Sequence, residues 1–315
     1  MPHVSVLIPT YNRIGYLRSA LLSVERQSYR DVELLVLDDG STDGTLEFLR
    51  GYRPPFPFHS FSFQGKERSY LRNIGVREAR GELVAFLDDD DEWIPGKVEK
   101  QVEFLGERPD VGLCHTRTVV IDAVGQVEAW ETAVHRKLYA ELCPRGHSYV
   151  SLADSCLMFT STVMVRKPVL EMVGGFDEEF HQKEDLDLYL RVSRVSKIGC
   201  VPEELVRYRS HPGGSGAGLG EAHIAVNEHH LESIEKDPAR DPDHAAQRAF
   251  LFSTARCHYA SARPTEALKT LKRMPAGSFA FLARPRHILF IAKALTKMLL
   301  ASVSRKRKAA GAAVR

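Results

Sequence analysis

The stretch LVAFLDDDD, residues 83–91, places five apolar residues directly before four consecutive aspartates. An uninterrupted apolar run of this length predicts a strand that is buried on both faces, as the strands of a parallel sheet are. Four like charges in a row usually form a solvated acidic loop, because they repel one another. Here the strand would fix them at the edge of a sheet, so we favour a site over a free loop.

The residues before this stretch alternate between two hydrophobic patterns. Apolar or alternating runs predict strands at residues 4–8, 32–37 and 58–63. Apolar residues at helical spacing predict helices at residues 14–24, 45–49 and 69–79. This alternation favours βαβ units, and therefore an α/β fold with a Rossmann-like, mostly parallel sheet flanked by helices.

Polar clusters follow three of the predicted strands. They are residues 10–13 (TYNR), 38–41 (DDGS) and 88–91 (DDDD). In open α/β sheets the ligand binds beyond the carboxyl ends of the strands. If the sheet is parallel, the three clusters therefore meet at one edge and form one site.

The acidic cluster suggests the chemistry of that site. Carboxylate oxygens are hard ligands that suit Mg²⁺ or Mn²⁺. Such a metal neutralises phosphate oxygens and stabilises a diphosphate leaving group. We therefore predict a divalent metal site within Asp88–Asp91.

A series of short sequence blocks resembles family 2 glycosyltransferases, which have the GT-A fold. The blocks are SVLIPTYNR (5–13), QSY (27–29), VLDDGSTDGT (36–45), RNIG (72–75), FLDDDDEW (86–93), GGFDE (174–178), EDLDL (184–188) and RSH (209–211). They keep the family's order and cover about residues 4 to 211. Any one block is modest evidence, whereas the ordered set is strong evidence.

The resemblance implies a nucleotide-sugar donor, with UDP the family's commonest nucleotide, and a set of positions that bind it. Those positions are Pro9, Thr10, Tyr11, Arg13, Asp39, Arg72, Asp88 and Asp89. Asp39 would accept a hydrogen bond from the base. Arg72 would lie near the base or the diphosphate.

The family's D-x-D pattern implies the metal ligands. Its first aspartate faces the ribose and its last binds the metal, which here gives Asp88 and Asp90. Asp91 follows directly, so two registers one residue apart stay open. His211 would contact the metal or the diphosphate, and the competing interpretation is a surface loop histidine.

Asp185 resembles the family's catalytic base. A carboxylate must take the proton of an acceptor hydroxyl as that hydroxyl attacks the anomeric carbon. Direct displacement from the opposite face of the leaving nucleotide inverts the anomeric configuration. The pair Glu184-Asp185 is also what the start of a helix favours, and both interpretations can hold together.

The leading functional hypothesis is an inverting glycosyltransferase that acts on a saccharide or lipid-linked acceptor in cell-surface polysaccharide or glycolipid synthesis. One alternative is transfer to a polyprenyl phosphate carrier. A second is a nucleotide-sugar-binding protein without catalysis, against which Glu184-Asp185 argues. A third is a nucleotidyltransferase, but Pro9–Arg13 lacks the glycine-rich phosphate loop of that class.

The composition is that of an ordinary folded protein. The net charge of +2 gives no reason to expect nucleic acid as a partner, and the five cysteines form no C-x-x-C pair. The scattered cysteines suit a cytoplasmic protein.

We expect a glycosyltransferase domain at residues 1–215 and a helical region at 216–315. Helices near 245–261 and 264–274 resemble one tetratricopeptide-like hairpin or a plain helical appendage. The segment 288–308 is apolar and basic, which fits either an ordinary packed helix with a basic tail or a helix that contacts the inner face of the membrane.

Overall fold

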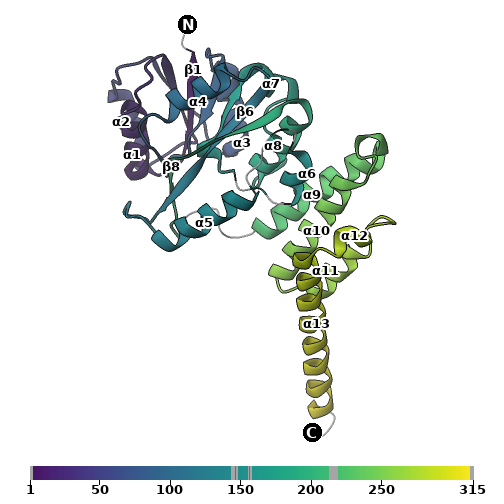
Figure 1. Cartoon of the computed structure of the whole chain (residues 1–315). Coiled ribbons are helices and arrows are strands. Elements are labelled where there is room, and N and C mark those ends of the chain that lie inside the picture. The colour runs from purple at the N-terminus through teal and green to yellow at the C-terminus, as the bar shows by residue number, and fades with distance from the viewer. Residues whose placement is uncertain are drawn as a thin grey trace. The chain divides into compact units, whose positions relative to one another are not determined.

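The computed structural model describes residues 3–142, 146, 148–154, 156, 158–212 and 219–312. The chain divides into two compact units, labelled by element in Figure 1. The N-terminal unit comprises Met1–Leu152 with Cys156–Gly216, and the C-terminal unit comprises Ala153–Ser155 with Ala217–Arg315.

The N-terminal unit is built on one eight-stranded sheet with the strand order β3-β2-β1-β4-β7-β6-β8-β5. Four of these strands are parallel neighbours: β1 (Val4–Thr10), β2 (Val32–Asp38), β3 (Phe58–Ser62) and β4 (Leu83–Phe86). They correspond to the strands predicted at residues 4–8, 32–37 and 58–63 and directly before the four aspartates. Thr10 lies beside Asp38 in the register of β1 and β2, so the polar clusters after both strands begin at the same edge.

The second half of the sheet is mixed. Its strands are β5 (Glu92–Trp93), β6 (Val111–Ile121), β7 (Met164–Arg166) and β8 (Lys197–Arg209). The strand β7 is antiparallel to β4 and β6, β5 is antiparallel to β8, and β6 runs parallel to β8. Local hydrophobicity predicts two separate strands at 113–115 and 119–121. The structure has one continuous strand instead, because β6 keeps its pairing with β8 through register shifts around Arg117.

Helices cover the sheet of the N-terminal unit (Figure 1). They are α1 (Ile14–Glu25), α2 (Thr45–Gly51), α3 (Glu67–Glu78), α4 (Lys97–Gly106), α5 (Ala129–Leu142), α7 (Lys167–Val173) and α8 (Glu184–Val195), with a 3₁₀ turn, η1 (Thr160–Thr162). The helix α6 (Tyr149–Asp154) begins in this unit, and its last two residues belong to the C-terminal unit. The helix α3 approaches the sheet closely at Gly75, where an added Cβ would lie 2.9 Å from Leu7 Cδ1.

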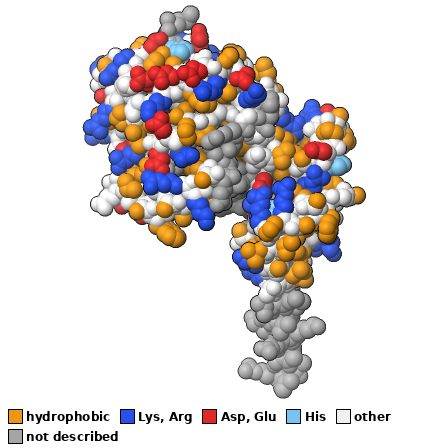
Figure 2. Space-filling model, in the orientation of Figure 1, with side chains coloured by type: hydrophobic (Ala, Val, Ile, Leu, Met, Phe, Trp, Pro, Cys, Tyr) orange, Lys and Arg blue, Asp and Glu red, His pale blue; other side chains and the backbone are white. Residues whose placement is uncertain are grey.

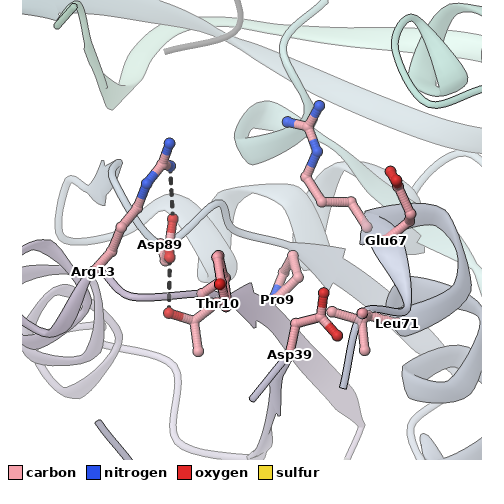
Figure 3. A pocket seen from close by; sticks show the side chains of 10 residues that line it. Pro9, Thr10, Arg13, Asp39, Glu67, Leu71 and Asp89 are labelled. Atoms are coloured by element: carbon pink, nitrogen blue, oxygen red, sulfur yellow. Dashed lines mark hydrogen bonds and ion pairs between the residues drawn. The ribbon is translucent and has the colours of Figure 1, made fainter. Parts of the chain in front are cut away.

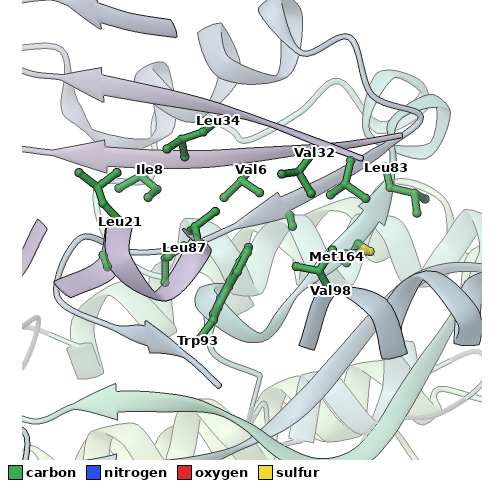
Figure 4. Packing of buried hydrophobic residues seen from close by; sticks show 14 of the residues in the cluster. Val6, Ile8, Leu21, Val32, Leu34, Leu83, Leu87, Trp93, Val98 and Met164 are labelled. Carbon is green, nitrogen blue, oxygen red and sulfur yellow. The ribbon is translucent and has the colours of Figure 1, made fainter. Parts of the chain in front are cut away.

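The core on one side of the sheet consists of aliphatic residues around Trp93. Figure 4 shows Val6 and Ile8 on the side of the sheet that also holds Leu21 and Trp93. The indole Nε1 of Trp93 donates to the carbonyl oxygen of Ser161 at 2.8 Å. This bond connects β5, which directly follows the acidic run, to η1.

The C-terminal unit is helical. Its elements are α9 (Leu219–Lys236), η2 (Pro238–Arg240), α10 (Ala245–Ala260), α11 (Pro264–Leu271), α12 (Phe279–Leu282) and α13 (Pro285–Ala312). The helix α10 packs against α9 and α11, and α11 packs against α13. The predicted helix at 245–261 agrees with α10 to one residue, whereas the second ends at Leu271 instead of 274. Within the described part of the chain, no helix is both long enough and apolar enough to cross a bilayer.

Candidate functional site

A cavity of about 430 Å³ lies at the carboxyl ends of the parallel strands (Figure 3). Its walls are formed by Pro9, Thr10, Tyr11, Arg13, Asp39, Gly65, Glu67, Arg68, Leu71 and Asp89. Six of these ten residues are positions that the resemblance implies for donor binding. They come from three separate segments, which the parallel strands bring to one edge as the polar clusters predict.

The floor of the cavity is held together by Asp89, which is almost fully buried. Thr10 Oγ1 donates to Asp89 Oδ2 at 2.7 Å, and the Arg13 guanidinium donates to Asp89 Oδ1 at 3.1 Å. Burial and then the neighbouring charge of Asp90 raise the pKa of Asp89 to about 7, and the guanidinium of Arg13 opposes both effects. Asp89 therefore fixes the end of β1 against the acidic loop.

The adjacent aspartates after β2 have different roles. Asp38 is buried, and its Oδ2 accepts the backbone N–H groups of Gly40 and Ser41, which forms the turn. Gly40 adopts a φ of +84°, which favours glycine there. Asp39 instead lies on the cavity wall, and its Oδ1 accepts the Lys66 N–H at 2.7 Å. The carboxylate of Asp39 thus faces the cavity, where it can accept an N–H of a ligand.

Arg72 is fully buried between two acidic groups. It donates to Asp88 Oδ1 at 2.6 Å and to Glu184 Oε1 at 2.7 Å. Burial alone would lower the pKa of Arg72, but the two carboxylates raise it above its ordinary value. Arg72 therefore connects the acidic loop to the start of α8, instead of lining the cavity.

The fourth aspartate of the run faces inward. Ser161 Oγ donates to Asp91 Oδ2 at 2.5 Å, and the Arg209 backbone N–H donates to Asp91 Oδ1 at 2.8 Å. Burial raises the pKa of Asp91 well above its ordinary value. Both oxygens are engaged inside the protein, so this arrangement favours the register in which Asp88 and Asp90 are the outer aspartates of the D-x-D motif.

Asp90 and His211 lie together, although 120 residues separate them in the sequence. Asp90 Oδ2 is 3.0 Å from His211 Nε2 and accepts a hydrogen bond from Arg13 at 2.6 Å. Among the residues that the structure describes, no three His, Cys, Asp or Glu side chains form a metal-binding group. A carboxylate oxygen and an imidazole nitrogen nevertheless suit Mn²⁺ or Mg²⁺ when a bound diphosphate supplies further oxygens. The two side chains fit such a cation.

Asp185 lies in the first turn of α8, partly buried, beside Glu184. Its Oδ1 accepts the Leu186 N–H at 2.8 Å. Burial raises the pKa of Asp185, and the charge of Glu184 adds to the increase. Because Glu184 binds Arg72, and Arg72 binds Asp88, an ion-paired chain joins the acidic loop to the residue next to the predicted base.

The structure adds site residues that the sequence analysis did not identify. Glu67 and Arg68 line the cavity, and the backbone of Glu67 has a φ of +62°. A non-glycine residue in this left-handed region costs about 1–3 kcal/mol and is frequent at functional sites. Ser161, which holds Asp91, also lacks a sequence signal, since it comes from a 3₁₀ turn seventy residues away.

The sequence is similar to known glycosyltransferases. The model of the family described as "Glycosyl transferase family 2" matches residues 5–161. An uncharacterized glycosyltransferase of Rickettsia typhi is 30% identical over 216 residues, which cover 67% of this chain and 64% of that protein. The putative teichuronic acid biosynthesis glycosyltransferase TuaG of Bacillus subtilis is 39% identical over 109 residues, 34% of this chain and 43% of TuaG.

The chain is shorter than several of its relatives. The matched segment spans only 32% of the uncharacterized glycosyltransferase of Rickettsia conorii, with 29% identity over 206 residues, 65% of this chain.

Solved structures share the fold. The structure of S. aureus TarS 1–349 in complex with UDP-GlcNAc has a TM-score of 0.62 at 18% identity and covers 93% of this chain and 79% of TarS 1–349. The mannosyltransferase PcManGT from Pyrobaculum calidifontis, solved with GDP-Man and Mn²⁺, has a TM-score of 0.60 at 17% identity. The alignment covers 96% of this chain and 86% of PcManGT.

Proposed function

Because the chain belongs to glycosyl transferase family 2 and has the GT-A fold, we propose that it transfers a sugar from a nucleotide-diphosphate sugar to an acceptor hydroxyl, with inversion. The observation that carries this proposal is the cavity at the carboxyl ends of β1, β2 and β4, with the Asp90–His211 pair beside it. An ion-paired chain then runs from Asp88 to the helix that carries Asp185.

The donor would occupy the cavity with its base against Asp39. The carboxylate of Asp39 would accept an N–H of the base, while Pro9 and Tyr11 contact the base and ribose. Arg13 lies between the cavity and Asp90, where its guanidinium can face the diphosphate. Asp90 and His211 would hold a divalent cation, whose charge would offset the charge of the departing diphosphate.

Asp185 would act as the general base. Its carboxylate takes the proton from the acceptor hydroxyl as the hydroxyl oxygen forms a bond to the anomeric carbon. The bond from that carbon to the diphosphate oxygen breaks on the opposite face, and the nucleotide diphosphate departs with the electron pair. Attack and departure on opposite faces invert the configuration, so no covalent sugar–protein intermediate forms.

A UDP-sugar is our proposed donor and a saccharide or lipid-linked hydroxyl our proposed acceptor. The TarS neighbour binds UDP-GlcNAc, and the TuaG relative is assigned to teichuronic acid synthesis, which together support cell-surface polysaccharide synthesis. This function would place the protein in the cytoplasm at the inner face of the membrane. Transfer to a polyprenyl phosphate carrier would use the same donor site, and acceptor assays distinguish the two.

Donor binding with and without metal tests the proposal. UDP, GDP, ADP and CDP are added with Mn²⁺ and then with excess EDTA, and the melting temperature is measured. A ligand at 100 times its Kd stabilises the folded state by about 2.7 kcal/mol, so the accepted nucleotide raises the melting temperature, and more so with Mn²⁺.

Two variants sharpen this experiment. Asp90→Asn should lose the metal-dependent part of the increase. Asp110→Asn should behave as the parent protein, because the ion pair of Asp110 with Lys197 is exposed at the surface. If no nucleotide raised the melting temperature, the proposed donor site would be contradicted. If a nucleotide raised the melting temperature equally with Mn²⁺ and with EDTA, the proposed metal dependence of donor binding would be contradicted.

A further inference from the structure

The charge of the chain is strongly segregated along the sequence. Residues 267–315 contain twelve Lys and Arg residues and no Asp or Glu. All 41 acidic residues lie within residues 1–266, although the whole chain has a net charge of only +2. The end of the C-terminal unit is therefore a cationic segment attached to a net acidic remainder.

The helix α13 has an apolar side that packs within its own unit. His287 and Ala294 are fully buried. The ring of Phe290 lies 5.2 Å from that of Phe252 and 5.5 Å from that of Tyr259, both on α10. These contacts define the inner face of the helix.

The opposite side of α13 is also apolar. Ile288, Leu289 and Leu295 are 53%, 56% and 42% exposed. The spacing i, i+7 places Ile288 and Leu295 on one stripe of the helix, away from Ala294. A helix at the surface of a globular unit normally presents polar residues there, so this stripe is an exception.

Other exposed side chains come from neighbouring parts of the sequence. Phe279, in the short helix α12, is 84% exposed. Lys293 is exposed one turn from Leu289, and Arg284 and Arg286 lie at the start of α13. In Figure 2, hydrophobic side chains gather on the C-terminal unit next to Lys and Arg side chains. We call Phe279, Ile288, Leu289, Leu295 and Lys293 the outer surface of α12–α13.

The sequence continues the same pattern beyond these residues. Leu299 and Val303 follow Leu295 at helical spacing, and the basic run Arg305–Lys308 comes next. An apolar stripe bordered by basic residues matches an anionic bilayer surface, since the apolar side chains enter the acyl boundary and the cations meet the lipid headgroups. A nucleic acid would match the charge, but it would leave Phe279 and the aliphatic stripe in water.

We propose that the outer surface of α12–α13 binds the surface of an anionic lipid bilayer. The aliphatic and aromatic side chains would insert into the boundary of the acyl chains, and the basic side chains would be attracted to the anionic headgroups. Such binding would hold the transferase unit close to lipid-linked acceptors. It does not depend on catalysis, so it can be measured without donor, metal or acceptor.

Co-sedimentation of the full chain with vesicles tests this surface. The protein should partition onto phosphatidylcholine–phosphatidylglycerol vesicles about tenfold more than onto pure phosphatidylcholine vesicles, and 0.5 M NaCl should remove most of the difference. The double variant Ile288→Ser, Leu289→Ser should lower the partition onto anionic vesicles about tenfold. The control is Met172→Ser, an exposed hydrophobic residue of the N-terminal unit, 69% exposed, and it should bind like the parent protein.

Thermal melts of both variants establish that they remain folded. Failure of the parent protein to bind anionic vesicles would overturn the proposal. Unchanged vesicle binding by the folded double variant would overturn it too. So would binding of the parent protein to RNA as strong as its binding to vesicles, if the double variant bound RNA equally well. Because no nucleotide is present, these failures are distinct from a failure of the proposed transfer reaction.

Discussion

At the scale of single residues, four consecutive aspartates meet four different environments. Asp88 pairs with Arg72, while Asp89 is buried beneath the cavity. Asp90 lies beside His211, and Asp91 is held inside the protein. Identical side chains thus divide into an ion-pair partner, two anchors and a candidate metal ligand, because the backbone turns them in different directions.

Replacement of Asp185 by asparagine tests the base. Asparagine keeps the size of the side chain but cannot take the acceptor proton, so kcat should fall about 10²–10⁴-fold. Calorimetry should find donor affinity within about twofold of the parent, because donor binding does not need the base. Asp110→Asn is the matched control and should keep the parental kcat. Parental turnover in Asp185→Asn would refute the assignment.

The environment of Asp185 also predicts a pH dependence. Burial and the charge of Glu184 raise the pKa of Asp185 above the ordinary aspartate value of about 4. The base works only when deprotonated, so kcat should decline as the pH falls through this raised pKa and be constant above it. The measurement is kcat against pH at saturating donor and acceptor. An acid limb centred near pH 4 would contradict the prediction.

At the scale of elements, the distance between α3 and the sheet matters for the site. The helix begins at Glu67 and Arg68, which line the cavity, and it carries Arg72 one turn later. Gly75 allows its close packing, since Leu7 and Leu37 occupy the space of a side chain. The position of Arg72 between Asp88 and Glu184 therefore depends on a glycine one turn further along.

Two glycine-to-alanine substitutions distinguish the effect of close packing on the free energy of unfolding from the effect of helix propensity. Gly75→Ala should lower the free energy of unfolding by about 1–3 kcal/mol, because its Cβ would overpack Leu7. Gly15→Ala is the control in α1, where no atom lies within 4 Å of the new Cβ. It should raise the free energy of unfolding by up to about 1 kcal/mol through helix propensity. Urea denaturation measures both, and a stabilised Gly75→Ala would contradict the packing argument.

The second half of the sheet was harder to predict at this scale. The sequence of β6 suggests two short strands, but the structure has one strand from Val111 to Ile121. Register shifts on both sides of Arg117 interrupt the regular alternation without ending the pairing with β8. A prediction from the local hydrophobic pattern ends a strand where the alternation stops, whereas hydrogen bonds to β8 continue along β6 past that point.

At the scale of the whole molecule, composition and charge divide along the chain. The N-terminal unit contains the sheet, the cavity and the ion-paired chain from Asp88 through Arg72 to Glu184. The C-terminal unit is helical and ends in the cationic segment 267–315. The proposed transfer and the proposed membrane contact therefore rest on different units, and each can be tested without the other.

Local sequence determined the first half of this protein. Largely apolar runs specify β1, β2 and β4, which are buried on both faces, and an alternating run specifies β3 at the edge of the sheet. The ordered blocks from SVLIPTYNR to RSH indicated the family, and the family model agrees with them. The convergence of the polar clusters at one sheet edge followed from the parallel order alone.

Only the tertiary structure decided what each polar side chain contacts. Ser161 lies seventy residues from Asp91, and His211 lies more than a hundred from Asp90, so no local pattern could pair them. The sequence left two registers open within four identical aspartates. Burial of Asp91 against Ser161 and Arg209 favours the register with Asp88 and Asp90 as the outer aspartates, because a carboxylate removed from water requires hydrogen-bond donors that distant segments supply.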